Sequence, residues 1–222
     1  MTTRSVRLDE WRLVAAQRTP ISELLNRKSY AMKRKAGEIF PNLTLTTSQG
    51  KPLAVPVPSA RFTHVQFRRW TGCPICNTHI ASLRRNAGRI ASAGIHEVLF
   101  FHSSQQDVKS FHQDLPFDAV ADPGKRYYRE LGVEQSWAYA MHPRALWAAI
   151  KGMGSRFNLA MTGGPTGLPA EFLIAADGLI KVVKYGRHAF DQWSVDELLE
   201  LAKQSASASS SQPLMDGAIM RR

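Results

Sequence analysis

Two cysteines are the residues of this chain best suited to chemistry. Cys73 and Cys76 are the only cysteines among 222 residues, and they stand three positions apart in the run Cys73-Pro74-Ile75-Cys76. A disulfide between them would close so small a loop that it would restrain the unfolded chain very little. Secreted scaffolds instead spread several disulfides along the chain. The spacing therefore indicates a reactive dithiol rather than a structural crosslink.

The pattern around the pair predicts a strand that ends before it and a helix that starts with it. Residues 62–67 are rich in β-branched and aromatic residues, and apolar residues recur every three or four positions after Cys76. Cys73 is then expected at a helix N-terminus, where unpaired amides and the helix dipole favour a thiolate. Pro74 suits the first helical turn, because its missing N–H would have no partner there. Cys76 could attack a mixed disulfide or a sulfenic acid on Cys73.

Two other interpretations of the pair stay open. A CxxC pair is half of a tetrahedral zinc site, but the chain has no other cysteine, and His79 is the nearest further candidate ligand. The two thiols could also be inert core residues. We predict the reactive dithiol, and we expect neither a metal nor a cofactor.

The alternation of strand and helix patterns predicts an α/β fold with a central mixed sheet flanked by helices. A terminal hairpin is expected around Asp177-Gly178, and Ser194 with Glu197 forms a capping box before the last helix. The expected elements are a hairpin at 42–46 and 53–57, strands at 62–67, 97–101, 119–121, 172–175 and 179–185, and helices from 76 to 94 and at 105–115, 125–131, 143–151 and 195–203.

Composition predicts one domain with two extensions. Residues 1–37 carry nine basic and three acidic residues and are expected to form a basic, helical N-terminal extension. Residues 38–204 are expected to form the α/β domain, in which the irregular segment 133–168 is a predicted insertion. Residues 205–222, which begin with a run of serine and alanine, are expected to form a disordered tail.

The net charge of +11 and the hydropathy pattern limit the function classes. More than half of the excess charge lies in the N-terminal extension, and no zinc-ligand set or aromatic-interleaved basic patch accompanies it, so we expect no nucleic-acid partner. The longest apolar stretches, such as 98–101, are far too short to cross a bilayer. No apolar segment typical of a secretion signal follows the basic start, so we expect a cytoplasmic protein with no membrane partner.

Four segments resemble the peroxiredoxin-like proteins of the alkyl hydroperoxide reductase and thiol-specific antioxidant (AhpC/TSA) family. They are FTHVQFRRWTGCPICNTHI, GIHEVLFFHSS, LPFDAVADPGKRYYRELGVE and LPAEFLIAADGLIKVVKYGRHAFDQWSVDELL. NLTLTTSQGKPL is similar to the entry hairpin of the same group. The resemblance spans roughly residues 40–204 apart from the predicted insertion, and it implies a thioredoxin-like fold.

The resemblance also implies roles for the dithiol. Cys73 would be the peroxidatic thiol, which attacks a hydroperoxide and becomes a sulfenic acid, and Cys76 would resolve it as an intramolecular disulfide. A thioredoxin-like protein or a low-molecular-weight thiol would then restore both thiols. Thioredoxin-like proteins place an aromatic residue before the dithiol and a cis-proline before the later strand. The residues expected to shape the site are Trp70, Thr71, Gly72, Pro74 and the cis-proline candidate Pro169.

The chain departs from the family pattern at two places. Peroxiredoxins carry a proline and then a threonine or serine three residues before the peroxidatic cysteine, whereas Thr71 lies two residues before Cys73 and no such proline precedes it. They also carry an arginine just before the later strand, where this chain has Pro169-Ala170-Glu171. Arg68 and Arg69 are the candidates for the missing charge.

A dithiol peroxidase is the leading hypothesis for the function. The alternatives are a thioredoxin-like disulfide reductase, and a redox-sensing or binding protein whose disulfide switches the N-terminal extension or the insertion. The expected partners are a hydroperoxide or disulfide substrate and a thiol reductant. A homodimer is a candidate assembly.

Overall fold

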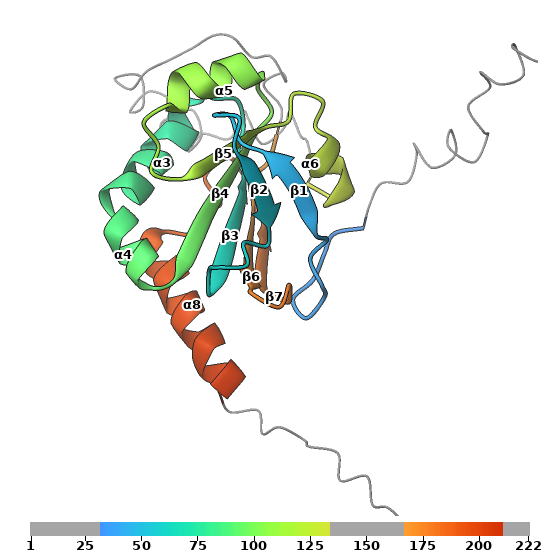
Figure 1. The fold of residues 1–222 in the computed structure, drawn as a ribbon, viewed down its shortest axis with the longest axis vertical. Coiled ribbons are helices and arrows are strands. Elements are labelled where there is room, and N and C mark those ends of the chain that lie inside the picture. Colours follow the sequence, from blue (N-terminus) through green and yellow to red (C-terminus); the bar gives the residue numbers. More distant parts are fainter. Residues whose placement is uncertain (1–31, 134–166, 211–222) are drawn as a thin grey trace, which may run out of the picture. The chain divides into compact units, whose positions relative to one another are not determined.

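A central mixed sheet organises the computed structural model, which describes residues 32–133 and 167–210. Strands β3 (Phe62–Phe67), β4 (Ile95–Phe101) and β5 (Asp118–Ala121) run parallel. Strand β6 (Ala170–Ala175) lies antiparallel to β3, and β7 (Ile180–Tyr185) lies antiparallel to β6, in the order β5-β4-β3-β6-β7. Helices flank this sheet (Figure 1), so the predicted α/β fold with a central mixed sheet is confirmed.

Four helices cover one face of the sheet. They are α3 (Pro74–Arg85), α4 (Ala87–Ser92), α5 (Gln105–His112) and α8 (Val195–Ser210). The N-terminal half of α3 and α5 pack on one end of that face, whereas the C-terminal end of α3 packs with α4 and α8 on the other. No helix within the described ranges has the length and apolar character that a membrane crossing requires.

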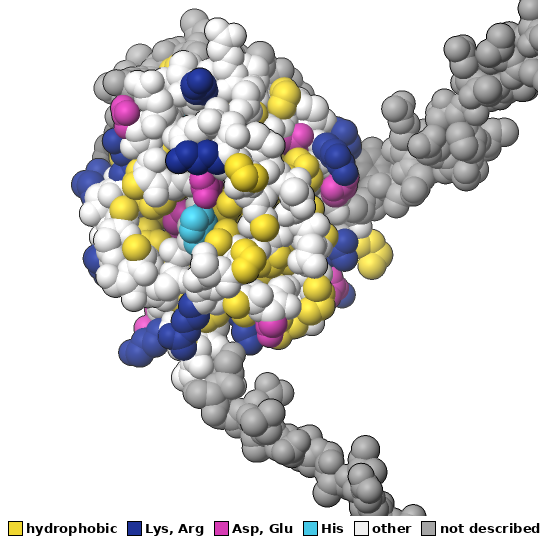
Figure 2. Space-filling view, viewed as in Figure 1, with side chains coloured by type: hydrophobic (Ala, Val, Ile, Leu, Met, Phe, Trp, Pro, Cys, Tyr) yellow, Lys and Arg dark blue, Asp and Glu magenta, His cyan; other side chains and the backbone are white. Residues whose placement is uncertain are grey.

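The opposite face is covered by a hairpin and a short helix. Strands β1 (Leu43–Thr46) and β2 (Pro52–Val55) pair antiparallel, and they lie on the same side as α6 (Arg126–Glu130) in Figure 1. The hairpin was predicted at these positions and is confirmed. Its apolar side chains join the same cluster as those of α6 and the sheet. On the side of the molecule shown in Figure 2, the lysine and arginine side chains are scattered rather than gathered in one patch.

Alternation along the strands builds a separate core on each face. In β4, Val98 and Phe100 pack with the hairpin and α6, whereas Leu99 and Phe101 pack with α3 and α5. All four side chains are fully buried. Successive side chains of a strand point to opposite faces, so a parallel strand covered on both faces is apolar nearly throughout. This arrangement explains why 98–101 is a continuous apolar run.

The helix expected from Cys76 to Gly94 is broken in two. Asn86 ends α3, and its side-chain amide donates to the carbonyl of Ser82 at 2.9 Å. Asparagine side chains compete in this way with the backbone hydrogen bonds of a helix. Apart from the last helix, the other predicted elements in the described ranges are confirmed with ends shifted by up to three residues.

The last helix begins as predicted but continues farther. Glu197 N–H donates to Ser194 Oγ at 3.2 Å and Ser194 N–H donates to the Glu197 carboxylate at 2.7 Å, which confirms the capping box. Helix α8 then runs through Ser210, so the prediction of disorder from residue 205 is wrong for 205–210. A capped, packed helix propagates readily through a run that includes alanine, because nucleation has already occurred. Residues 211–222 lie outside the described residues.

The N-terminal boundary also differs from the prediction. Residues 32–37 are not helical, and Gly37, with φ +88°, donates its N–H to the Ile180 carbonyl at 2.8 Å. The chain therefore joins the sheet one residue before the boundary expected at 38. Residues 1–31 lie outside the described residues, as does the core of the predicted insertion, 134–166, with the helix expected at 143–151.

The continuation of α8 predicts the effect of a glycine at Ala206, which packs on the core beneath the helix. Ala206→Gly is expected to lower the free energy of unfolding by about 1 kcal/mol, because glycine costs that much in a helix interior. Urea denaturation followed by circular dichroism measures it. Ser207→Ala at the neighbouring exposed position should leave the value unchanged or slightly raised. An Ala206→Gly protein as stable as the wild type would contradict a helical 205–210.

Candidate active site

The dithiol lies where β3 leads into α3. Cys73 is the N-cap residue, with φ −66° and ψ 114°, and Pro74 occupies the first turn as predicted. Asn77 N–H donates to the Cys73 carbonyl at 3.0 Å and closes that turn. Both cysteines are free thiols, and their exposed fractions are 0% for Cys73 and 1% for Cys76. Both sulfurs therefore lie in the interior, within an apolar cluster.

A hydrogen bond between the two sulfurs shifts their pKa values in opposite directions. Burial and donation of the thiol hydrogen to Cys76 raise the pKa of Cys73 well above its ordinary value. Accepting that hydrogen bond lowers the pKa of Cys76 to about 6 despite its burial, with help from the charges of Arg68 and Arg69. Cys76 is therefore the sulfur whose ionisation these contacts favour. The thiolate expected on Cys73 stays a prediction, which burial of that sulfur opposes.

Arg68 is a buried guanidinium held by three side chains. Its Nη1 donates to Gln192 Oε1, and its Nη2 donates to His79 Nδ1 at 2.8 Å. The same Nη2 lies 3.7 Å from Glu171 Oε1. His79 donates from Nε2 to the Trp193 carbonyl at 2.7 Å, and burial and the Arg68 charge lower the pKa of His79 to about 3. A neutral histidine of fixed tautomer thus accepts from Arg68 and holds it beside the dithiol.

A buried polar stripe on the same face of the sheet was missed by the sequence analysis. His64 and Gln66 of β3 both contact Glu97 of β4, His64 through Nδ1 at 3.0 Å and Gln66 through its amide. Glu171 of β6 pairs with Gln66 in the sheet register, and burial raises the pKa of this carboxyl. The signal was present in the sequence, because His64, Gln66 and Arg68 occupy every second position of a strand and must share a face.

The residues between Arg68 and the dithiol form a tight turn. Cys73 N–H donates to the Trp70 carbonyl at 3.0 Å, and the turn includes the buried Gly72. The guanidinium carbon of Arg69 lies 4.6 Å from the centre of the Trp70 ring. Trp70 joins the apolar cluster that holds both cysteines. The structure thus places Trp70, the predicted aromatic residue, and Arg68 and Arg69, the predicted charges, next to the dithiol.

Thr71 places an unused hydroxyl in the same turn. Its N–H donates to Ser103 Oγ at 3.1 Å, and its carbonyl accepts from the Asn77 amide at 3.1 Å. Its own Oγ1 is buried and has no hydrogen-bond partner among the described residues. A buried hydroxyl without a partner is uncommon, so this group is available to a bound substrate.

Pro169 follows a trans peptide bond, so the expected cis-proline is wrong. In the described chain the one cis bond is Val55–Pro56, at the end of β2. The Pro169 carbonyl accepts from Gly186 N–H at 2.8 Å, and a Cβ on Gly186 would lie 2.6 Å from Pro169 Cγ. The ring is therefore packed against Gly186 in an extended entry to β6, where the trans bond, favoured by about 0.5–1 kcal/mol, fits. A role of Pro169 in shaping the site stays a prediction.

A zinc site at the dithiol lacks further ligands in the described part of the chain. Both ring nitrogens of His79 already contact protein atoms. Within residues 32–133 and 167–210, no three histidine, cysteine, aspartate or glutamate side chains gather as a metal site would require.

Residues 82–188 match the AhpC/TSA antioxidant enzyme family. The predicted resemblance to that family is confirmed. The matched segment begins after Cys76, so the AhpC/TSA match covers the sheet from β4 to β7 and leaves the roles of the two cysteines as predictions.

Solved structures show the same fold at low sequence identity. Peroxiredoxin 6 of Arenicola marina is 16% identical, with a TM-score of 0.61 over 85% of this chain and 80% of its own. The peroxidoxin BcpB of Mycobacterium tuberculosis is 15% identical, with a TM-score of 0.57 over 77% and 97%. AhpC of Enterococcus faecalis is 13% identical, with a TM-score of 0.57 over 81% and 96%. The thioredoxin-like fold class is therefore confirmed, whereas no curated protein matches this chain in sequence.

The sulfur charges predict a pH titration that distinguishes the two cysteines. The reduced protein should gain thiolate absorbance at 240 nm with a midpoint near pH 6, because the pKa of Cys76 is lowered to about 6. Cys73→Ser should keep this transition, since a hydroxyl can still donate to Cys76, and Cys76→Ser should lose it. Arg69→Gln should move the midpoint to higher pH, because it removes a positive charge that favours the thiolate.

Arg85→Gln is the matched control for this titration, since Arg85 is exposed at the far end of α3. Its midpoint should equal that of the wild type. A wild-type midpoint near the ordinary thiol value of about 8.5 would rule out the charge assignment.

Proposed function

We propose that this chain is a thiol-dependent oxidoreductase that reduces hydroperoxides with Cys73 and Cys76. The observation that supports it best is the buried guanidinium of Arg68, held by three side chains and lowering the pKa of Cys76. A charge fixed in a low-dielectric interior acts more strongly on a neighbouring ion than an exposed charge does. A strongly shifted pKa with a specific charge partner is typical of a functional site. The AhpC/TSA match supports the same class.

In the first step, the Cys73 sulfur attacks the terminal oxygen of the hydroperoxide. The Cys73 proton passes to the Cys76 thiolate, which already accepts its hydrogen bond. An S–O bond forms as the O–O bond breaks, and the departing alkoxide takes the proton from Cys76 to leave as an alcohol. Cys73 is thereby oxidised to a sulfenic acid, the hydroperoxide is reduced, and Cys76 is again a thiolate.

In the second step, the Cys76 thiolate attacks the sulfur of the Cys73 sulfenic acid. The S–S bond forms and hydroxide leaves, taking a proton from solvent to become water. Residues three apart at the start of a helix are neighbours, so the two sulfurs meet after a small adjustment. The low pKa of Cys76 suits this step because it keeps the attacking thiolate available at neutral pH. Two external thiol groups then supply the two electrons that restore the dithiol.

Arg68 is proposed to replace the arginine that the family carries before the later strand. Phe67 pairs with Ala170 in the antiparallel register, so Arg68 lies across the ladder from Pro169, at the end of the strand where that arginine is expected. The positive charge near the dithiol is thus supplied by the residue that follows β3 instead of by a residue of the segment that leads into β6. The unpartnered hydroxyl of Thr71 is the group proposed to donate to the peroxide.

Cys73→Ser is expected to slow peroxide consumption by about 10³-fold or more, because it removes the attacking sulfur. Cys76→Ser should instead accumulate a sulfenic acid on Cys73, detected by mass spectrometry as a dimedone adduct. Met32→Leu, at an exposed position far from the chemistry, should consume peroxide at the wild-type rate. Wild-type peroxide consumption no faster than that of free cysteine would exclude the peroxidase.

A disulfide reductase is the second candidate, and the same thiolate favours it. A thiolate of low pKa beside a second thiol is also what thiol–disulfide exchange requires. Under this alternative, the reduced protein reduces insulin disulfides stoichiometrically without peroxide, and it reacts with peroxide at the rate of free cysteine. The peroxidase proposal predicts the reverse order of the two rates. The redox-sensing alternative concerns residues 1–37 and 133–168, most of which lie outside the described residues.

A further inference from the structure

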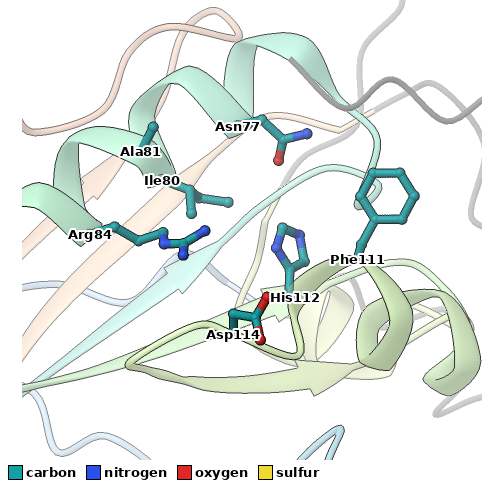
Figure 3. A pocket seen from close by; sticks show the side chains of 7 residues that line it. All are labelled: Asn77, Ile80, Ala81, Arg84, Phe111, His112 and Asp114. Carbon is teal, nitrogen blue, oxygen red and sulfur yellow. The ribbon is translucent and has the colours of Figure 1, made fainter.

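A groove between α3 and α5 begins at Asn77, which directly follows Cys76, and has no role in the mechanism above. Figure 3 shows Asn77, Ile80 and Arg84 of α3 along one side of it. These residues follow Cys73 at intervals of four, three and four positions, which is the spacing of one helix face. The groove therefore continues the same face of α3 on which Cys73 stands.

His112 forms part of the opposite side and presents an unused nitrogen. Its ring stacks on Phe101 at 4.6 Å between centroids, it is only 7% exposed, and in Figure 3 it points into the groove. Its Nε2 is buried and has no hydrogen-bond partner among the described residues. Burial and the charge of Arg84 lower the pKa of His112 to about 4, so the ring is neutral at physiological pH. A buried nitrogen of this kind is suited to a peptide amide group of a ligand.

Opposite charges stand at the end of the groove far from the dithiol. Arg84 directs its guanidinium toward the groove, and Asp114 lies beneath His112 (Figure 3). Both residues are exposed, and neither forms an ion pair within the described part of the chain. A cation and a carboxylate at one end complement the carboxylate and ammonium of a free α-amino-acid group. A simple anion would meet repulsion from Asp114.

We propose that this groove binds the reductant, a peptide thiol of two or three residues that carries a free α-amino-acid group. The proposal rests on the function proposed above. A rise of about 1.5 Å per residue places Arg84 roughly 16 Å beyond Cys73 along the helix. An extended tripeptide spans about 10 Å, and the arginine side chain covers the remainder. A single amino acid thiol, at about 3.5 Å, is too short.

The sulfur chemistry of this reductant follows from the charges of the dithiol. In the oxidised protein, the peptide thiolate attacks the Cys73 sulfur, a mixed disulfide forms, and the Cys73–Cys76 bond breaks. Cys76 leaves as a thiolate, which its low pKa favours, because a thiol of lower pKa leaves faster. A second peptide thiolate then attacks the peptide sulfur of the mixed disulfide and releases Cys73. Two peptide thiols are oxidised to one disulfide, and the protein gains two electrons.

The binding test uses S-methylglutathione, a tripeptide with a free α-amino-acid group and a blocked sulfur, titrated calorimetrically into the reduced full-length protein. Saturable binding is expected, weakened about tenfold by Arg84→Gln and by Asp114→Asn, since each removes a charge-assisted hydrogen bond. His112→Phe, which keeps the stacking on Phe101, should weaken it a few-fold. Arg85→Gln, the exposed neighbour outside the groove, should bind as the wild type does. Absence of saturable binding, or equal losses in the Arg84 and Arg85 variants, would overturn the proposal.

A kinetic test separates recognition from chemistry. Reduction of the oxidised protein by glutathione should slow in Arg84→Gln and Asp114→Asn by the same factors as binding. Reduction by dithiothreitol, which has no amino-acid group, should not change. If the variants slow reduction by both reductants equally, the groove does not recognise the peptide and the proposal is wrong. The proposal is also wrong if the protein binds no peptide but turns over a carboxylated alkyl hydroperoxide at a rate that depends on Arg84.

The two proposals fail in different ways. If peroxide consumption depends on Cys73 but S-methylglutathione does not bind, the groove proposal is wrong and the peroxidase stands. If S-methylglutathione binds with the expected Arg84 dependence but Cys73→Ser leaves peroxide consumption unchanged, the groove is a peptide site and the peroxidase is wrong.

Discussion

The buried guanidinium of Arg68 is the constraint on which the candidate site depends. An ionised group in the interior costs several kcal/mol unless its hydrogen bonds and charge are matched, and removing one partner of a buried ion pair costs about 3–5 kcal/mol. Gln192, His79 and Glu171 match its two terminal nitrogens from the segment before α8, from α3 and from β6, whereas its Nε has no hydrogen-bond partner among the described residues. Arg68 therefore fixes three elements relative to the end of β3. The same charge then acts on the Cys76 sulfur.

The polar stripe on β3, β4 and β6 extends that constraint through the interior. His64, Gln66 and Glu97 hydrogen-bond one another between the two apolar clusters of the helix-covered face. The network is satisfied only in part, because His64 Nε2 and Gln66 Oε1 are buried without a hydrogen-bond partner among the described residues. An unpaired buried polar group is costly, so the bonds that are made must offset that cost. They join β3 to β4 beneath the helices that cover this face.

Helix α3 connects the chemistry with the groove. Its first turn places Cys73 at the N-cap and Cys76 within reach of Arg68 and Arg69, and a later turn places Arg84 beside His112. A helix holds such groups at a fixed separation because its rise per residue is constant. The stack of His112 on Phe101 and the shared cluster of Val108 and Cys76 hold α5 against it. One rigid element thus relates the reacting sulfurs to the surface that we propose recognises the reductant.

The sequence by itself determined the features that depend on neighbours along the chain. Strand and helix periods, Pro74 after Cys73 and the Ser194–Glu197 capping box are local signals, so the sheet, the placement of the dithiol and the start of α8 were predicted. Tertiary structure alone decided the surroundings of the sulfurs, because the pKa of Cys76 depends on its hydrogen bond with Cys73, on burial and on Arg68, whose partners are 11 to 124 positions away. It also decided that Pro169 follows a trans bond and packs against Gly186, and that α8, which packs on the core, continues past 205. Local patterns specify elements, whereas charge and burial arise from residues that meet only after the chain has folded.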